Sequence, residues 1–226
     1  MLSRRVLLAG MVMALCTGAG SAVYAAGAGT VQNMSGTLSA QRADGSVRVL
    51  SQKSEVVPGD VLTTQKDSYA QINFTDGSSI TMRPNSQMKL EAYQFVQEQP
   101  ENDNVLFRLV KGGLRTVTGF IGKRGNQDAY RINTATATIG IRGSGGDTYH
   151  NDDRGDANAT YHKTYVGSYV MQTPQGQIVI GEGQVGAAKP GLPPQIIPAP
   201  PFPIVNLLQV GTSNVTKPGS DGCVVK

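Results

Sequence analysis

Residues 69–82 read YAQINFTDGSSITM, and this stretch decides the fold class. Apolar and polar residues alternate on both sides of residues 75–77, which is the pattern of β-strands with one buried face. A three-residue loop at 75–77 places Ile72 opposite Ile80, so that apolar residues share one face. A two-residue loop would instead place apolar residues opposite polar ones. The sequence therefore predicts a β-hairpin closed by Gly77, with a positive φ that glycine adopts without strain.

The same alternation recurs in short runs along the chain, and no segment sustains apolar residues at helical spacing. Gly167 and Ser168 fall between two such runs and predict a tight hairpin turn. Residues 143–164 are polar and glycine-rich, which predicts a solvated hairpin insertion. The expected fold is all-β, an antiparallel β-sandwich or a β-helix-like roll. The other predicted strands are residues 36–40, 46–50, 61–64, 87–91, 105–110, 114–118, 129–133, 137–141, 163–166, 169–172 and 177–180.

Both ends of the chain differ from this pattern. Arg4 and Arg5 precede an apolar run at 6–16 and then small residues, which predicts a signal peptide over 1–28 with cleavage after Ala26 or Ala28. The export route is the general secretory one or, because of the paired arginines, the twin-arginine one. We expect a periplasmic or secreted protein with no stable transmembrane segment after cleavage.

The C-terminal residues 190–226 are rich in proline, which favours an extended tail and excludes a sheet interior. The β domain is accordingly expected at 29–189. Cys223, in the tail, is the one cysteine left after signal removal, so it is expected to be a free thiol or to pair between molecules.

Charge argues against a nucleic acid partner. Loss of Arg4 and Arg5 lowers the number of Lys and Arg from 20 to 18, against 16 Asp and Glu. The nearly balanced mature chain carries no overall field for a polyanion.

The basic residues nevertheless gather between 108 and 142, where Asp128 is the one acidic residue. On alternating strands several of them would share a face and attract an anionic partner, either an acidic envelope protein or a lipopolysaccharide or cell-wall polymer. The alternative is ordinary surface charge balanced by Glu98, Glu101 and Asp103 nearby. The candidate partner-binding residues are Lys111, Arg115, Lys123, Arg124, Arg131 and Arg142, and the candidate structural turns are Gly77, Gly143 and Gly167.

Motifs for catalysis and cofactors are weak. His150, His162 and several aspartates lie within 143–164 and could ligate a cation, but their spacing does not match an EF-hand, so a plain polar loop is favoured over a metal site. Ser144 lacks the surroundings of a nucleophile elbow, and residues 119–124 lack the glycine and hydroxyl of a phosphate loop. We expect a binding protein without a cofactor; a structural or adhesion-associated component and an envelope hydrolase remain alternatives.

Four segments together identify a family resemblance. Their sequences are PGDVLTT at 58–64, FTDGSSI at 74–80, VKGGLR at 110–115 and TATATIGIRGS at 134–144. In this order and spacing they resemble the FecR-domain family over residues 55–185. The family's name-giving member senses transporter occupancy in the periplasm and controls a sigma factor. With only residues 1–5 before the apolar run, the resemblance implies the exported interaction module without the cytoplasmic sigma-regulating part.

Overall fold

The expected all-β class is confirmed. A computed structural model describes residues 27–200 except 127, 152–155 and 157. In this part of the chain fifteen strands form one hydrogen-bonded sheet, with short 3-10 turns η1 at Pro100–Asn102 and η2 at Ile121–Lys123. The proposed signal peptide, residues 201–226 and Cys223 lie outside the described residues. The strands are β1 Gly29–Ser35, β2 Leu38–Gln41, β3 Val47–Leu50, β4 Glu55–Val56, β5 Val61–Thr64, β6 Tyr69–Phe74, β7 Ser79–Met82, β8 Gln87–Gln94, β9 Asn104–Val117, β10 Tyr130–Asn133, β11 Thr138–His150, β12 Thr160–Thr173, β13 Gly176–Ile180, β14 Val185–Ala188 and β15 Gln195–Ile197.

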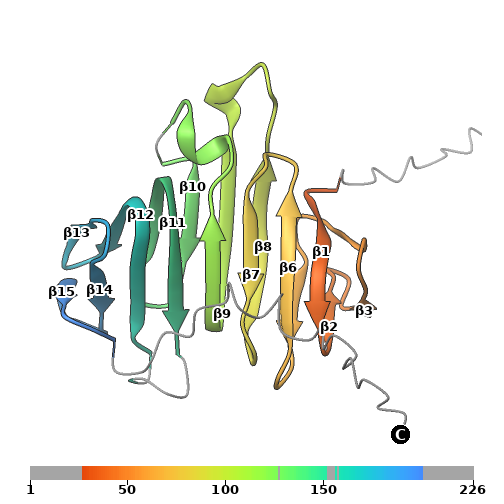
Figure 1. The fold of residues 1–226 in the computed structure, drawn as a ribbon, viewed down its shortest axis with the longest axis horizontal. Helices are drawn as coiled ribbons and strands as arrows, with labels where there is room; N and C mark the ends of the chain where they lie inside the picture. The colour runs from red at the N-terminus through yellow and green to blue at the C-terminus, as the bar shows by residue number, and fades with distance from the viewer. Residues whose placement is uncertain (1–26, 127, 152–155, 157, 201–226) are drawn as a thin grey trace, which may run out of the picture.

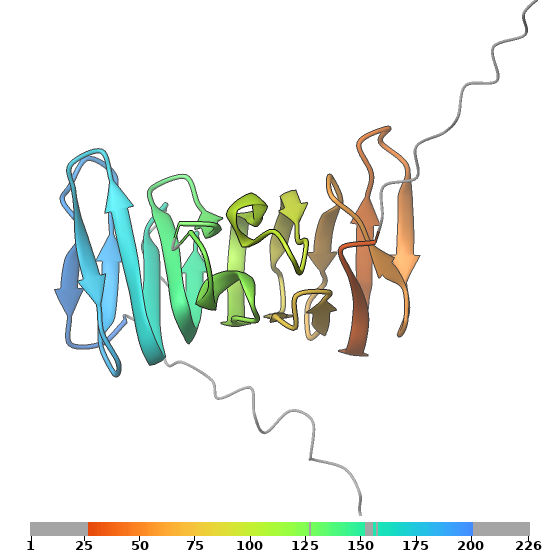
Figure 2. The ribbon, with the colours of Figure 1, turned by 90° about the horizontal axis from the view of Figure 1, so that it is seen from above.

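The sheet doubles over into two layers that enclose the core. The first layer runs β4-β1-β6-β7-β9-β11-β12-β14-β15. The second runs β3-β2-β5-β8-β9-β10-β11-β12-β13. Figure 1 shows the strands side by side along the long axis, and Figure 2, from above, shows the two rows. Because β9, β11 and β12 appear in both lists, these long strands join the layers.

Each joining strand bends at a glycine with positive φ: Gly112 at 88°, Gly143 at 63° and Gly167 at 76°. β9 pairs with β8 before its glycine and with β7 after it. β12 likewise pairs with β14 before Gly167 and with β13 after it. The backbone turns sharply at these points because glycine has no Cβ to oppose a positive φ.

Two sequence-based predictions about this region are wrong. Gly167 does not close a tight hairpin with Ser168, because both lie within the continuous strand β12. Residues 143–164 are not an insertion loop, because most of them extend β11 and β12, which pair from Gly145↔Val166 to His150↔Thr160. Two of the polar residues that suggested a loop, His150 and His162, are buried between the layers instead.

The pairing of β10 also departs from the antiparallel expectation. β10 runs parallel to β9, with Ile132 opposite Phe107. Parallel neighbours need a crossover longer than a hairpin turn, and the connection that contains η2 provides it.

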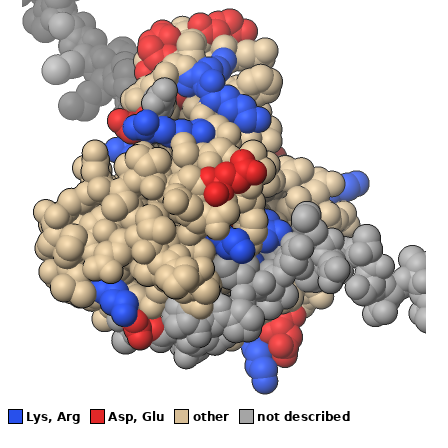
Figure 3. Space-filling model, turned by 60° about the vertical axis from the view of Figure 1, so that its left-hand side comes forward, with Lys and Arg blue, Asp and Glu red and all other residues tan. Residues whose placement is uncertain are grey.

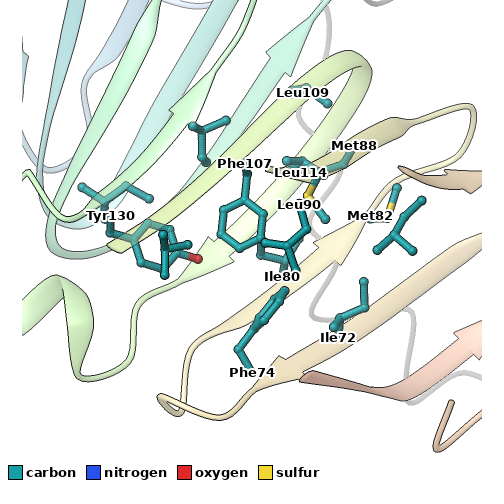
Figure 4. Packing of buried hydrophobic residues seen from close by; sticks show 14 of the residues in the cluster. Ile72, Phe74, Ile80, Met82, Met88, Leu90, Phe107, Leu109, Leu114 and Tyr130 are labelled. Atoms are coloured by element: carbon teal, nitrogen blue, oxygen red, sulfur yellow. The ribbon is translucent and has the colours of Figure 1, made fainter. Parts of the chain in front are cut away.

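The hairpin at 69–82 has the expected register. Ala70 lies opposite Met82, Ile72 lies opposite Ile80, and Gly77 has a φ of 79°. The inward residues enter a core where the rings of Phe74 and Phe107 have centroids 5.2 Å apart and those of Phe107 and Tyr130 5.6 Å (Figure 4).

Four strands were not expected, namely β1, β4, β14 and β15. β15 falls inside the segment expected to be an extended tail, where Gln195 pairs with Ala187 of β14. Pro194 is buried beside it, and Ile197 packs on a small cluster that includes Tyr149 and Tyr161. The sheet therefore continues past residue 189 and keeps its prolines outside the ladder.

Candidate partner-binding groove

The DGS segment of the hairpin serves the fold. Asp76 is fully buried, and its Oδ1 accepts hydrogen bonds from the backbone N–H and hydroxyl of Ser78 at 3.1 and 2.6 Å. The hydroxyl of Tyr93 lies 3.2 Å from the same oxygen. Gly119 lies so close that a Cβ there would be 2.2 Å from the carbonyl oxygen of Asp76. Oδ1 of Asp76 therefore holds the turn.

A buried charge cluster lies on the outer face of the first layer. Asp147 is 0% exposed although its side chain points away from the core. Arg83 Nη2 donates to Asp147 Oδ2 at 2.8 Å. Arg115 donates from Nε to Oδ1 at 2.8 Å and from Nη2 to Oδ2 at 3.0 Å. Two guanidinium groups thus share one carboxylate, so these three side chains carry a net positive charge.

Tyr165 completes the cluster through a β-bulge. Gly145 lies opposite Val166 and Gly146 opposite Thr164, so Tyr165 is an extra residue in β12. A bulge redirects a side chain, and the Tyr165 hydroxyl donates to Asp147 Oδ2 at 2.8 Å. Burial, together with the negative charge of Asp147, raises the pKa of Tyr165 to about 12. The phenol therefore stays protonated and acts as a hydrogen-bond donor.

Next to this cluster a hollow of about 390 Å³ opens between β9, β11 and β12. Gly145 lies directly opposite both Val117 and Val166, which are 52% and 60% exposed. Directly opposed residues share a face, so the missing side chain at Gly145 leaves an apolar slot between two valines. The lining residues are Arg115, Thr116, Val117, Thr118, Lys123, Gly143, Gly145, Gly146, Tyr165 and Val166.

A second hollow, of about 330 Å³, adjoins the first and is basic. Both are lined by Lys123 and Gly143, and we call the two hollows together the groove. The second is lined by Gly122, Lys123, Arg124, Gly125, Arg142 and Gly143.

Four of the six predicted partner-binding residues line this groove, but their availability differs. Arg115 is held by Asp147, and Arg124 Nε pairs with Asp103 Oδ2 at 3.1 Å. Lys123 and Arg142 are exposed and form no ion pair with a carboxylate of the described residues. The groove therefore presents two cations to solvent.

The other two predicted residues lie elsewhere. Lys111 is exposed beside the bend of β9, opposite Gln87. Arg131 is half-buried, with Nη2 3.4 Å from Asn104 Oδ1. On the face drawn in Figure 3, lysines and arginines form separate groups, several beside acidic side chains. The proposed common face is thus reduced to the part around the groove.

The histidines of the expected loop are buried between the layers. His162 is 0% exposed, and its Nδ1 lies 2.9 Å from Thr148 Oγ1. Burial lowers the pKa of His162 to about 3. Across the described residues, His, Cys, Asp and Glu do not gather in groups of three or more that could hold a metal ion. Asp152 and Asp153, part of the candidate cation loop, lie outside those residues.

Sequence analysis did not identify Asp147, Tyr165, Val117 or Val166 as parts of one surface. The sequence places Asp147 in a predicted solvated loop and Tyr165 in the predicted strand 163–166, so neither suggests a buried contact. A pairing of Arg115 with Asp147 becomes visible only once β9 and β11 are placed side by side.

Comparison with known proteins finds a matching family model over part of the chain. The family model described as "FecR protein" matches residues 60–160. No curated protein matches the chain. Two crystal structures titled as a "putative anti-sigma factor" from Parabacteroides distasonis are similar, with TM-scores of 0.48 and 0.47 and sequence identities of 10% and 11%. Each alignment covers 61% of this chain and 58% of the other, so it spans little more than half of those proteins. Within the described residues there is no helix long and apolar enough to cross a membrane.

Proposed function

Residues 60–160 of this chain are a FecR domain, and on this basis we propose that the protein is a non-enzymatic binding module that acts outside the cytoplasm. Its partner is anionic and binds at the groove. The partner class is an acidic envelope protein or an anionic polymer of the cell wall or lipopolysaccharide.

The observation that supports this proposal most strongly is the pair of exposed cations at the groove. Lys123 on η2 and Arg142 at the bend of β11 line one hollow. The Asp147 cluster beside it adds positive rather than negative charge, because two arginines share one carboxylate. Cations fixed on a rigid surface give a lasting positive potential, which speeds the encounter with an anion.

A binding role without catalysis also agrees with the burial of the carboxylate beside the groove. A general base must be accessible to the proton that it removes. Asp147, the carboxylate nearest in sequence to the glycines of the groove, is buried beneath two arginines and Tyr165.

Export rests on the signal-peptide pattern of residues 1–28. Mass spectrometry of the protein from cells is expected to find a mature start near residue 27 or 29 in the periplasmic or secreted fraction. An intact Met1 start in the cytosol would contradict an extracytoplasmic role.

The binding test reverses the two exposed cations together, Lys123→Glu with Arg142→Glu. The control is Lys66→Glu with Lys111→Glu, which changes the charge equally at exposed positions that do not line the groove. Arg115 and Arg124 are unsuitable for this test because their reversal would also break the ion pairs of Arg115 with Asp147 and of Arg124 with Asp103.

In pull-downs from envelope extract at increasing salt, wild type and control are expected to retain the same partner, with retention falling as salt rises. The groove variant is expected to lose it with an unchanged melting temperature. Equal retention by all three proteins would place the interface away from the groove.

A further inference from the structure

We propose that the groove binds an extended acidic peptide segment, with an aliphatic side chain of that peptide seated over Gly145 and its carboxylates on Lys123 and Arg142. This inference rests on the proposed function, because it names the partner class for the same site.

The two hollows of the groove fit two kinds of chemical group, an apolar one and an anionic one, carried by one ligand. The first is bounded by Val117 and Val166, whose exposed fractions of 52% and 60% leave apolar surface in water. The second is bounded by Lys123 and Arg142. Because Lys123 lines both, an apolar group and an anion of one ligand lie next to each other when both hollows are filled.

A peptide satisfies this combination better than the other anionic partners. A charged polysaccharide supplies anions but no branched aliphatic group for the slot. A lipid supplies a long alkyl chain, whereas the apolar side chains that line the slot are those of Val117, Val166 and Tyr165, which suit one short aliphatic group. A peptide brings backbone N–H and C=O groups together with apolar and acidic side chains.

Gly145 gives a direct way to close the slot. A Cβ built there would lie 3.7 Å from the carbonyl oxygen of Thr116, an ordinary contact, and the backbone φ is not positive. At Gly146, by contrast, a Cβ would lie 2.7 Å from His162 Nε2. Gly145→Leu is therefore expected to fill the slot between the valines without disturbing the strand.

Gly140→Leu is the matched control. Gly140 lies on the same strand β11, its Cβ would be 3.9 Å from Val170, and it lines neither hollow. Both variants add the same side chain at an unstrained glycine, so a difference between them reports on the slot.

The experiment uses the full mature chain and two labelled peptides, Asp-Asp-Leu-Asp-Asp and Asp-Asp-Ser-Asp-Asp, in fluorescence anisotropy titrations at low salt. Wild type is expected to bind the leucine peptide about tenfold more tightly, as burial of one aliphatic side chain allows. Gly145→Leu is expected to remove this preference, whereas Gly140→Leu keeps it. Lys123→Glu with Arg142→Glu is expected to weaken both peptides.

The outcomes separate this inference from the proposed function. Equal affinity for the two peptides, with both weakened by the charge reversals, would overturn the aliphatic seat but leave an anion-binding groove. Failure of both peptides, combined with binding of anionic phospholipid vesicles or lipopolysaccharide that Gly145→Leu abolishes, would overturn the peptide in favour of a lipid. Peptide binding that survives the charge reversals would contradict the groove itself, and with it both proposals.

Discussion

Two antiparallel strand pairs of this molecule, β6–β7 and β11–β12, bury their core-facing sides with different kinds of side chain. In the β6–β7 pair, aliphatic residues such as Ile72 and Ile80 face the core and polar residues face out. In the β11–β12 pair the core side carries Thr148, His150 and His162, all buried. The first pair is stabilised by apolar burial, whereas the second depends on polar groups that must find partners inside the protein.

Partners are present in the second pair on both of its faces. On the core side, Thr148 bonds to His162, and His150 Nδ1 lies 2.9 Å from Thr160 Oγ1. On the outer side, Asp147 forms ion pairs with Arg83 and Arg115. The comparison teaches that a strand can be buried on both sides without apolar alternation when hydrogen bonds and ion pairs satisfy most of its polar groups, although His162 Nε2 has no hydrogen-bond partner among the described residues.

Removing the charge at the centre of the second pair is expected to have the largest effect on stability. Asp147→Ala leaves two buried guanidinium groups without their carboxylate, which costs about 3–5 kcal/mol. Asp128→Ala, at an exposed position, is the control and is expected to change little. Urea unfolding measures both, and similar values for the two variants would show that Asp147 contributes no more than a surface charge.

The turn of the first pair provides the next test. Asp76→Ala removes the acceptor of two hydrogen bonds from Ser78 and a third from Tyr93, a loss of about 2–3 kcal/mol. Gly77→Val forces a β-branched residue to a φ of 79°, at roughly 1–2 kcal/mol. The sequence predicts a smaller loss of stability for Asp76→Ala than for Gly77→Val, but burial of Asp76 makes the carboxylate the larger contribution. Chemical denaturation that ranks the two variants in the opposite order would contradict this.

The sequence predicts the structure of the β6–β7 pair better than that of the β11–β12 pair. Alternation located the β6–β7 hairpin and its register, because there the buried face is apolar throughout. It failed at 143–164, because threonine and histidine facing a core look like a solvated loop when their partners are unknown. The sequence also predicts a hairpin turn at Gly167, because it lies between two alternating runs, whereas the structure uses its positive φ for a bend inside one strand.

The candidate site was predictable in part. Four of the six predicted basic residues line the groove because the sequence places them near the bends of β9 and β11 and the turn η2. The ion pair of Arg124 with Asp103 agrees with the alternative of charge balanced by nearby acids. The contact of Arg115 with Asp147 could not be predicted, since it joins segments 32 residues apart. The apolar slot was also hidden, because Val117, Gly145 and Val166 come from three strands.

Acid should weaken the second pair more than the first, through His162. Its pKa in the folded protein is about 3, lowered from 6.5 chiefly by burial and opposed by the charge of Asp147. Below about pH 6.5 the unfolded chain therefore binds a proton that the folded chain does not. The stability due to this histidine is fully present above pH 6.5 and declines as the pH falls toward 3.

Between pH 7 and pH 5.5 the wild type should lose about 1 kcal/mol more than His162→Gln, whose amide can still bond to Thr148. His150, whose pKa is also lowered by burial, is retained in both proteins and so cancels in the comparison. Urea midpoints at the two pH values measure the difference. Parallel pH profiles would mean that His162 is protonated in the folded protein.

The smallest expected effect on stability concerns β15, the strand at the end of the first layer. β15 adds three residues to β14, and its Ile197 packs on the cluster of Tyr149 and Tyr161 at the outer end of the second pair. A chain that ends at residue 189 lacks this strand, and loss of a partly buried isoleucine is expected to cost roughly 0.5–1 kcal/mol. A chain that ends at residue 200 keeps the strand and should match the full-length protein. Both should unfold cooperatively, because the main core contains no residue beyond Ala188. If the shorter chain fails to fold, β15 is essential to the sheet; if the two truncations have equal urea midpoints, β15 adds nothing to the stability of the layer.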